Sequence, residues 1–242
     1  MPPPLLKRRY CAWPAGFLLL AFIASSPPVF AVDCVVLLHG LARTSGAMKK
    51  LVKPFENEGY QVINVAYPSR KKTVEQLAPL AVKERGYSKC NAEGKVNFVT
   101  HSMGGILVRW YLAHNEIPGL GRVVMMAPPN QGSQVVDKLR DVPGFKLING
   151  SAGLQLGTDA AGVPAGLGPV KFNLGVIAGN KTFNPVLSQL LPNPDDGKVS
   201  VASTRVSGMA DHITLPVTHT FMMKSEKVIE QAVHFIGHGR FK

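Results

Sequence analysis

Cysteine, long apolar runs and acidic residues are all scarce in this sequence of 242 residues. Its 3 cysteines include no Cys-x-x-Cys pair, which argues against a structural zinc site. No Gly-x-x-x-x-Gly-Lys-Ser/Thr stretch occurs, which excludes a P-loop for nucleotide phosphates. There is also no internal repeat and no low-complexity tract. We therefore expect one globular domain that uses no metal and no cofactor.

Acidic residues number 15 against 27 lysines and arginines, so the formal net charge is +12. The basic side chains are scattered, apart from a cluster at residues 70–72, and they do not alternate with aromatic residues as in nucleic-acid sites. We expect no nucleic-acid partner. A basic surface favours peripheral contact with anionic membrane lipid, although solubility alone accounts for it. We expect a monomer.

An apolar run at residues 15–24 is shorter than the roughly 20 residues that span a bilayer. Three basic residues precede it, and Val29 and Ala31 occupy the −3 and −1 positions of a cleavage site. This pattern predicts a signal peptide over residues 1–31 and an exported mature domain over residues 32–242, in the periplasm or outside the cell. An uncleaved membrane anchor is the alternative.

Cleavage of the signal peptide would remove Cys11 and leave Cys34 and Cys90 in an oxidising compartment. Each of these two cysteines precedes or opens a predicted strand. If the two strands are parallel, both cysteines lie near the same edge of the sheet, where a disulfide can join them. Two separate thiols are the alternative.

Apolar runs typical of buried strands alternate with stretches of helical spacing along the mature chain. Strands are expected at residues 34–38, 61–67, 96–100, 122–127, 172–179 and 213–217, and helices at residues 45–58, 73–87, 106–112 and 228–236. This alternation predicts an α/β domain with a mainly parallel central sheet, helices on both faces and right-handed crossovers. Pro79 is expected to kink the second helix.

The third strand-to-helix junction has the strongest chemical signal. An apolar run ends at His101, and helical spacing begins within a few residues. So sharp a turn forces Ser102 at its corner into a strained conformation with an exposed side chain, and Gly104 is needed because a Cβ there would meet the incoming strand. The stretch Thr-His-Ser-Met-Gly resembles the G-x-S-x-G nucleophile elbow of α/β-hydrolases, with Thr100 in place of the first glycine. The flanking residues resemble secreted bacterial lipases and esterases.

A serine nucleophile needs a general base within hydrogen-bond reach, and the base needs an acid that fixes its tautomer. The resemblance implies the chain order serine, acid, histidine, which Ser102, Asp196 and His219 supply. Asp196 is preferred because its Asp-Gly-x-Val stretch resembles the acid loop of the lipases. Asp195 is the nearest rival, and Asp211 is a weaker one.

His219 is preferred to His212 by its place relative to the last expected strand. Residues that follow a parallel strand reach the edge at which Ser102 is presented, whereas His212 and Asp211 precede their strand. His219 also resembles the terminal histidine segment of the family. His212 is expected to be structural or to lie on the surface.

The resemblance also implies an oxyanion hole made by two backbone N–H groups. One belongs to Met103, directly after the nucleophile, and the other to Leu41, after the His-Gly pair that ends the first strand. His39 and His101 are expected to support the site. Six apolar residues are expected to ring its entrance: Leu41, Met103, Met125, Met126, Phe221 and Met222.

Between about residues 130 and 170 the periodicity weakens, because seven glycines follow a short predicted helix at residues 133–139. In the hydrolases that the chain resembles, the cap over the pocket is inserted after the corresponding strand. We therefore expect a small, flexible cap with little regular structure here. A passive surface loop is the alternative.

Together these features imply a serine hydrolase that cleaves carboxylic esters, with a small-molecule ester or lipid as substrate. The same three residues would also serve an acyltransferase, a thioesterase or an amidase. A hydrolase-fold protein that binds a lipid or a partner without catalysis is a further alternative, from another functional class.

Overall fold

The computed structural model describes residue 1 and residues 31–91, 93–183 and 185–242. The domain begins at residue 31, and the predicted signal peptide lies almost wholly outside the described residues. Among the helices that are described, none has the length and apolar character needed to cross a membrane.

In the described residues, a single sheet of six strands has the order β2-β1-β3-β4-β5-β6. The strands are β1 (Cys34–Leu38), β2 (Gln61–Val65), β3 (Val96–His101), β4 (Leu120–Met126), β5 (Leu174–Gly179) and β6 (Asp211–Leu215). Every neighbouring pair is parallel. This confirms the predicted fold class, in which buried apolar strands are joined by helical crossovers.

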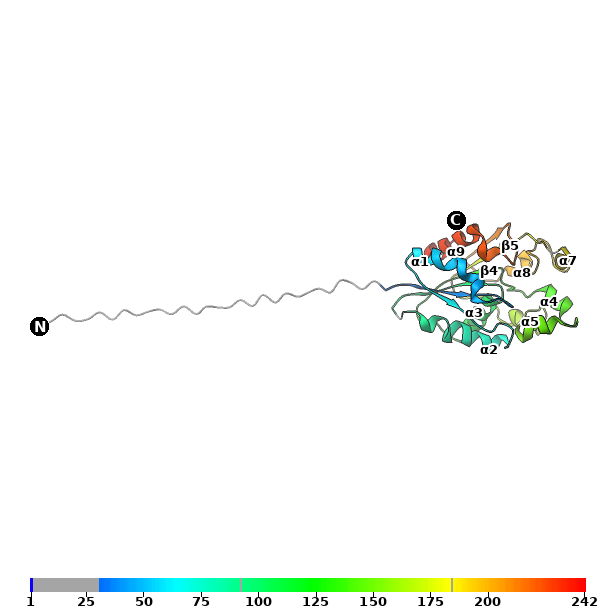
Figure 1. Cartoon of the computed structure of the whole chain (residues 1–242), viewed down its shortest axis with the longest axis horizontal. Helices are drawn as coiled ribbons and strands as arrows, with labels where there is room; N and C mark the ends of the chain where they lie inside the picture. Colours follow the sequence, from blue (N-terminus) through cyan, green and yellow to red (C-terminus); the bar gives the residue numbers. More distant parts are fainter. Residues whose placement is uncertain (2–30, 92, 184) are drawn as a thin grey trace. The chain divides into compact units, whose positions relative to one another are not determined.

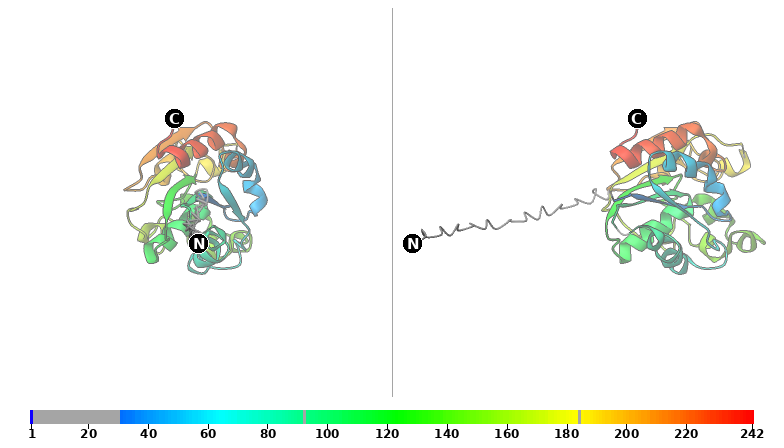
Figure 2. Two further views of the ribbon diagram at one scale, coloured as in Figure 1. Left: turned by 90° about the vertical axis from the view of Figure 1, so that its left-hand side faces the viewer. Right: turned by 60° about the vertical axis from the view of Figure 1, so that its left-hand side comes forward.

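Helices cover both faces of the sheet (Figure 2). The α-helices are α1 (Lys49–Asn57), α2 (Val74–Ala78), α3 (Met103–His114), α4 (Gln134–Leu139), α5 (Phe145–Leu154), α6 (Val163–Gly166), α7 (Pro185–Ser188), α8 (Val201–Thr204) and α9 (Glu226–His238). Alternate residues of β1 face opposite sides, so Val36 packs with α2 and α3 whereas Val35 packs with α1 and α9. Both residues are fully buried, as a two-sided core requires.

The strand order reverses between β1 and β3. From β1 the chain goes to β2 on one side and then crosses to β3 on the other side. In open α/β sheets, ligands bind beside the carboxyl ends of the strands at such a switch point. A ligand site is therefore expected at the loops that follow β1 and β3.

Several element boundaries differ from the sequence-based expectation. The expected helix at residues 73–87 is divided at Pro79, where α2 passes into a π-helical segment, Pro79–Glu84. A proline has no N–H to donate within a helix, so the hydrogen-bond pattern must change there. Strand β5 begins two residues later than expected, and β6 lies two residues earlier.

The expectation of little regular structure between residues 130 and 170 is wrong. Helices α4, α5 and α6 lie in this segment, and Figure 1 shows α4 and α5 beside each other at one end of the domain. Gly150 interrupts α5 with φ of +67°, a conformation that glycine adopts without steric cost. The glycines therefore shape short helices here rather than preventing them.

The structure joins Cys34 and Cys90 in a disulfide with a Cα–Cα distance of 5.8 Å. Cys34 is the first residue of β1, and Cys90 lies in the segment that leads to β3. The bond therefore fixes the amino-terminal edge of the sheet, at the opposite end of the strands from the loops at the switch point.

Candidate active site

Ser102 lies at the corner between β3 and α3 with φ of +53° and ψ of −123°. A side chain with a Cβ rarely adopts a positive φ, so this backbone is strained. The Ser102 N–H donates to the Met126 carbonyl at 2.8 Å, which holds the corner against β4. Ala42 and Ala127, which follow β1 and β4, also have positive φ values. In the described part of the chain, the non-glycine residues with positive φ therefore all lie at the carboxyl edge of the sheet.

The two glycines after Ser102 allow the corner to form. A Cβ on Gly104 would lie 2.7 Å from the Leu38 carbonyl oxygen, so the collision is with the neighbouring strand β1 and not, as expected, with the strand β3 that enters the corner. A Cβ on Gly105 would lie 3.2 Å from the Thr100 hydroxyl oxygen. Thr100 is fully buried at the position where a glycine is usual, and the absent Cβ of Gly105 leaves room for it.

A continuous line of hydrogen bonds runs from Ser102 through His219 to Asp196. The Ser102 hydroxyl donates to His219 Nε2 at 3.1 Å, and His219 Nδ1 donates to Asp196 Oδ2 at 2.8 Å. This assignment of the proton follows from the partners, because a carboxylate only accepts. The side chains of Asp196 and His219 are 1% and 6% exposed. The structure thus brings together three residues that lie far apart in the sequence.

The Asp196 loop fixes the carboxylate in this orientation. Asp196 Oδ1 accepts the N–H groups of Lys198 and Val199 at 3.0 and 2.8 Å, which leaves Oδ2 for the imidazole. The His219 N–H donates to the Asp196 carbonyl oxygen, so the two loops are also joined through the backbone. Gly197, which directly follows Asp196 in its loop, has φ of +95°.

The rival residues have other partners. Asp195 accepts hydrogen bonds from the Ser188 hydroxyl and the Gly197 N–H, so its carboxylate shapes its own loop. Asp211 accepts the N–H groups of His212 and Phe241 at the start of β6. His212 contacts Thr204 through Nε2 and lies within β6, away from the edge at which Ser102 stands.

The predicted oxyanion donors, the N–H groups of Leu41 and Met103, lie on either side of the switch point. Met103 is the first residue of α3, where a backbone N–H has no partner within the helix and the helix dipole is positive. A Cβ on Gly40 would lie 3.1 Å from Ser102 Cβ, so the backbone before Leu41 packs directly against the corner. Leu41 itself lines the cavity over Ser102.

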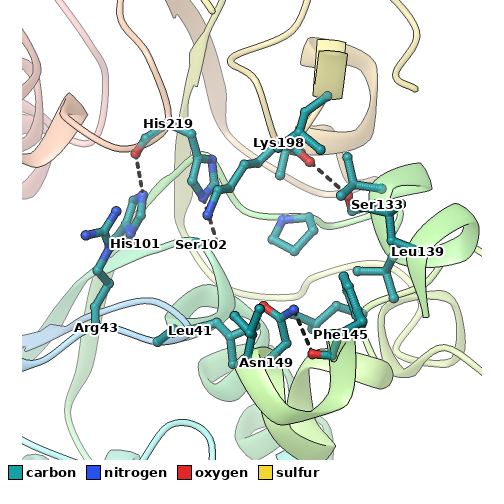
Figure 3. A pocket seen from close by; sticks show the side chains of 18 residues that line it. Leu41, Arg43, His101, Ser102, Ser133, Leu139, Phe145, Asn149, Lys198 and His219 are labelled. Atoms are coloured by element: carbon teal, nitrogen blue, oxygen red, sulfur yellow. Dashed lines mark hydrogen bonds between the residues drawn. The ribbon is translucent and has the colours of Figure 1, made fainter. Parts of the chain in front are cut away.

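His101 stabilises the loop that carries His219 through a hydrogen bond to its backbone. Its Nε2 donates to the His219 carbonyl oxygen at 3.0 Å, and the two rings lie 4.7 Å apart (Figure 3). Burial, and then the neighbouring His219, lower the pKa of His101 well below its usual value, so this ring is neutral. His39 is also buried, and it stacks on the Tyr67 ring at 4.0 Å. Both histidines therefore lie where supporting groups were expected.

No protein-family model and no curated protein matches this chain. Solved structures do match it. The mature lipase BlEst2 from Bacillus licheniformis superposes with a TM-score of 0.61 at 20% identity, over 82% of this chain and 89% of its own. A structure of the metagenome-derived lipolytic enzymes LipS and LipT superposes with a TM-score of 0.55 at 17% identity, over 86% of this chain and 94% of its own.

Phospholipase PlaB from Legionella pneumophila superposes with a TM-score of 0.55 at 20% identity, over 72% of this chain and 46% of its own. These matches share the parallel sheet with flanking helices. The chain has the α/β-hydrolase fold. In this chain the strained serine follows β3, and Asp196 and His219 follow later strands, which is the usual order of the three residues in the fold.

A cavity of about 320 Å³ lies over Ser102 (Figure 3). Its apolar wall includes Val136, Leu139, Phe145, Ile148 and Leu156, all from the segment between residues 130 and 170. Val136 and Leu139 lie in the short helix that was predicted at residues 133–139, whereas the helix that carries Phe145 and Ile148 was not predicted. A volume of this size is at the lower end of the roughly 300–1,000 Å³ typical of small-molecule pockets.

The predicted apolar ring is wrong except for Leu41. The four methionines Met103, Met125, Met126 and Met222 are fully buried in the core, and Phe221 is 52% exposed but does not line the cavity. Their strands and helices are covered on both faces, so apolar residues next to the site face inward. In the described part of the chain, no group of three or more His, Cys, Asp or Glu residues could hold a metal ion.

Proposed function

We propose that this chain is a serine hydrolase that cleaves carboxylic esters through an acyl-enzyme on Ser102. The single observation that carries the proposal is the line of hydrogen bonds from the Ser102 hydroxyl through His219 to Asp196, at 3.1 and 2.8 Å. A serine hydroxyl so placed can lose its proton to an imidazole whose tautomer is fixed by a buried carboxylate.

In the first half of the reaction, His219 Nε2 takes the Ser102 proton as the oxygen attacks the ester carbonyl carbon. The negative charge that forms on the carbonyl oxygen is stabilised by the N–H groups of Met103 and Leu41. Asp196 stabilises the imidazolium. His219 then gives its proton to the alcohol as the carbon–oxygen bond breaks, which leaves the acyl group on Ser102.

In the second half, His219 takes a proton from a water molecule that attacks the acyl carbonyl. The tetrahedral intermediate collapses, Ser102 recovers its proton from His219, and a carboxylic acid leaves. The apolar wall over Ser102 supports an alkyl acyl group as the part of the substrate that it holds.

Hydrolysis of p-nitrophenyl esters of increasing chain length, with fluorophosphonate labelling in parallel, tests the proposal. Wild-type protein should hydrolyse short and medium acyl esters and should be labelled once, and Ser102→Ala should lose both properties. Ser133→Ala is the matched control, because Ser133 lines the same cavity but donates its hydroxyl to the Lys198 carbonyl. Equal labelling of wild type and Ser102→Ala would contradict the proposal.

We also infer that the mature domain is exported. The disulfide between Cys34 and Cys90 supports this, because such bonds persist in oxidising compartments. Mass spectrometry of the protein recovered from cell fractions should find a chain that begins near Val32 with both cysteines oxidised. A full-length chain with free thiols in the cytoplasm would contradict the inference.

A further inference from the structure

The cavity over Ser102 adjoins a second hollow, here called the side groove. The side groove has a volume of about 580 Å³ and shares Arg43 and Ile148 with the cavity. Arg70 and Lys71, which follow β2, line the groove together with Leu147 of α5. The other lining residues are Thr44, Tyr67, Pro68 and Ser69. The two hollows therefore adjoin at Arg43 and Ile148, and Arg43 borders both.

Apart from the buried histidines His101 and His219 and the buried Tyr67, every ionisable side chain that lines these hollows is an arginine or a lysine. Arg43 and Lys198 line the cavity, Arg43, Arg70 and Lys71 line the side groove, and no described Asp or Glu lines either. No ion pair found within the described residues includes any of these four cations. Their charges are therefore not neutralised by the protein, which is the condition for binding an anion.

The cations at the cavity lie close enough to affect one another and the site. Burial, followed by the Arg43 charge, lowers the pKa of Lys198. Arg43 and Lys198 both contribute to the lowered pKa of His101, after burial and His219. Asp196 opposes the shift of Lys198, but its carboxylate is already engaged by His219 and two backbone N–H groups.

The apolar and cationic walls lie on different sides of the proposed nucleophile. Figure 3 shows Arg43 on one side of Ser102, with Leu139 and Phe145 on the other. The side chain of Lys198 extends from its loop toward Ser102 and His219 in the same view. An ester bound with its carbonyl at Ser102 and its acyl chain on the apolar wall would direct its alcohol part toward Arg43.

We propose that Arg43, Lys198 and the side groove form a subsite for a phosphate group on the alcohol part of the ester. This rests on the proposed function and names its substrate class: esters of a short or medium acyl group with a phosphorylated alcohol, such as an acylglycerol phosphate. Phosphate suits the subsite because it carries up to two charges, and arginine binds its oxygens with two parallel N–H groups.

Two substrates that differ only in phosphate test the subsite: 1-octanoylglycerol and 1-octanoylglycerol 3-phosphate. Both are used as dissolved monomers, so that adsorption to a lipid surface does not contribute. We expect kcat/KM of the wild type to be at least about tenfold higher for the phosphate ester, since each charged hydrogen bond to phosphate contributes about a tenfold effect or more. The advantage should shrink as salt is raised.

Arg43→Gln should lower the ratio of the two kcat/KM values about tenfold, and Lys71→Gln should lower it severalfold. Lys53→Gln is the matched control, because Lys53 is exposed on α1 and lines neither hollow. Glycerol 3-phosphate should also inhibit hydrolysis of a neutral p-nitrophenyl ester competitively, and less so in Arg43→Gln. If Arg43→Gln does not fold, the double change Arg70→Gln with Lys71→Gln carries the same test at exposed positions.

A wild-type ratio near one, or a ratio that Lys53→Gln lowers as much as Arg43→Gln, would overturn the subsite. Inhibition by inorganic phosphate as strong as that by glycerol 3-phosphate would show that the groove binds a free anion rather than a substrate group, which also overturns it. The failure of the proposed function looks different: neither ester is hydrolysed, and Ser102 is not labelled by a fluorophosphonate.

Discussion

Replacement of Asp196 by asparagine should nearly abolish ester hydrolysis, and the structure explains why the amide cannot adapt. Asp196 Oδ1 accepts two backbone N–H groups, from Lys198 and Val199. In Asp196→Asn the amide oxygen must keep that position, because an NH₂ group there would face two donors. The NH₂ group therefore points at His219 Nδ1 and can only donate to it.

A donor at Nδ1 forces the histidine into the tautomer with its proton on Nε2. That nitrogen then cannot accept the Ser102 proton. The lost charge adds to the effect, since a carboxylate about 4 Å from an imidazolium contributes about 4 kcal/mol at an effective dielectric constant of about 20. Together the two effects predict a fall in kcat of about 10³–10⁴-fold, comparable with the same change in serine proteases.

The neighbouring residue supplies a control with the same change of charge. In Asp195→Asn the amide oxygen can still accept the Gly197 N–H, and the NH₂ group can donate to the Ser188 hydroxyl. We expect a fall in kcat of no more than about fivefold. Steady-state kinetics with p-nitrophenyl butyrate measure both variants, with thermal melting to verify their folding. Equal losses in the two variants, or a loss under tenfold in Asp196→Asn, would refute the assignment.

Three further predictions concern stability. Gly104→Ala should lower the free energy of unfolding by about 1–3 kcal/mol and reduce activity, because the new Cβ would lie 2.7 Å from the Leu38 carbonyl oxygen. Denaturant titration measures the loss, and Gly237→Ala is the control because a Cβ there would meet nothing within 4 Å. Reduction of the Cys34–Cys90 disulfide, which closes a separation of 56 residues, should cost about 2–4 kcal/mol, and an unchanged melting temperature in dithiothreitol would contradict it. Burial lowers the pKa of His101, so the unfolded chain binds a proton that the folded protein excludes. Stability should therefore fall as pH drops below about 6.5, by up to about 1.4 kcal/mol per unit, and His101→Gln should flatten that slope in denaturation series between pH 5 and 7.5.

The sheet, and the edge at which the candidate site lies, could be predicted because both follow from the alternation of apolar strands with helical stretches. Strands buried on two faces are read as continuous apolar runs, and parallel strands place their following loops at one edge. That edge argument distinguished His219 from His212 without any coordinates. The choice between Asp196 and Asp195 was harder, since both lie in the same loop, and it depended on resemblance. Only the hydrogen bonds show that Asp195 is engaged with Ser188 and Gly197.

The segment between residues 130 and 170 was predicted poorly for a physical reason. Helix propensity is low where glycine is frequent, so the sequence between residues 140 and 170 gave little local support for helices. Helix α5 is stabilised by its tertiary contacts instead: Phe145 packs on the core, and Ala152 is fully buried. Of the cations of the proposed subsite, the sequence singled out only the cluster at residues 70–72, and gave no reason to join it to Arg43 or Lys198. Arg43 and Arg70 follow different strands, and only the fold brings them to one groove.

The elbow shows how a sequence pattern can be broken while its geometry is kept. The first glycine of the pattern is usual because the strand residue two places before the serine faces the helix residue three places after it. Here those positions are Thr100 and Gly105, and a Cβ on Gly105 would lie 3.2 Å from the Thr100 hydroxyl oxygen. The same Cβ would lie 3.0 Å from Met125 Sδ, so the constraint acts on the combined volume of Thr100, Gly105 and Met125 rather than on position 100 alone. Thr100 is acceptable because the space that it needs is left free on α3, and the strained φ of Ser102 is retained.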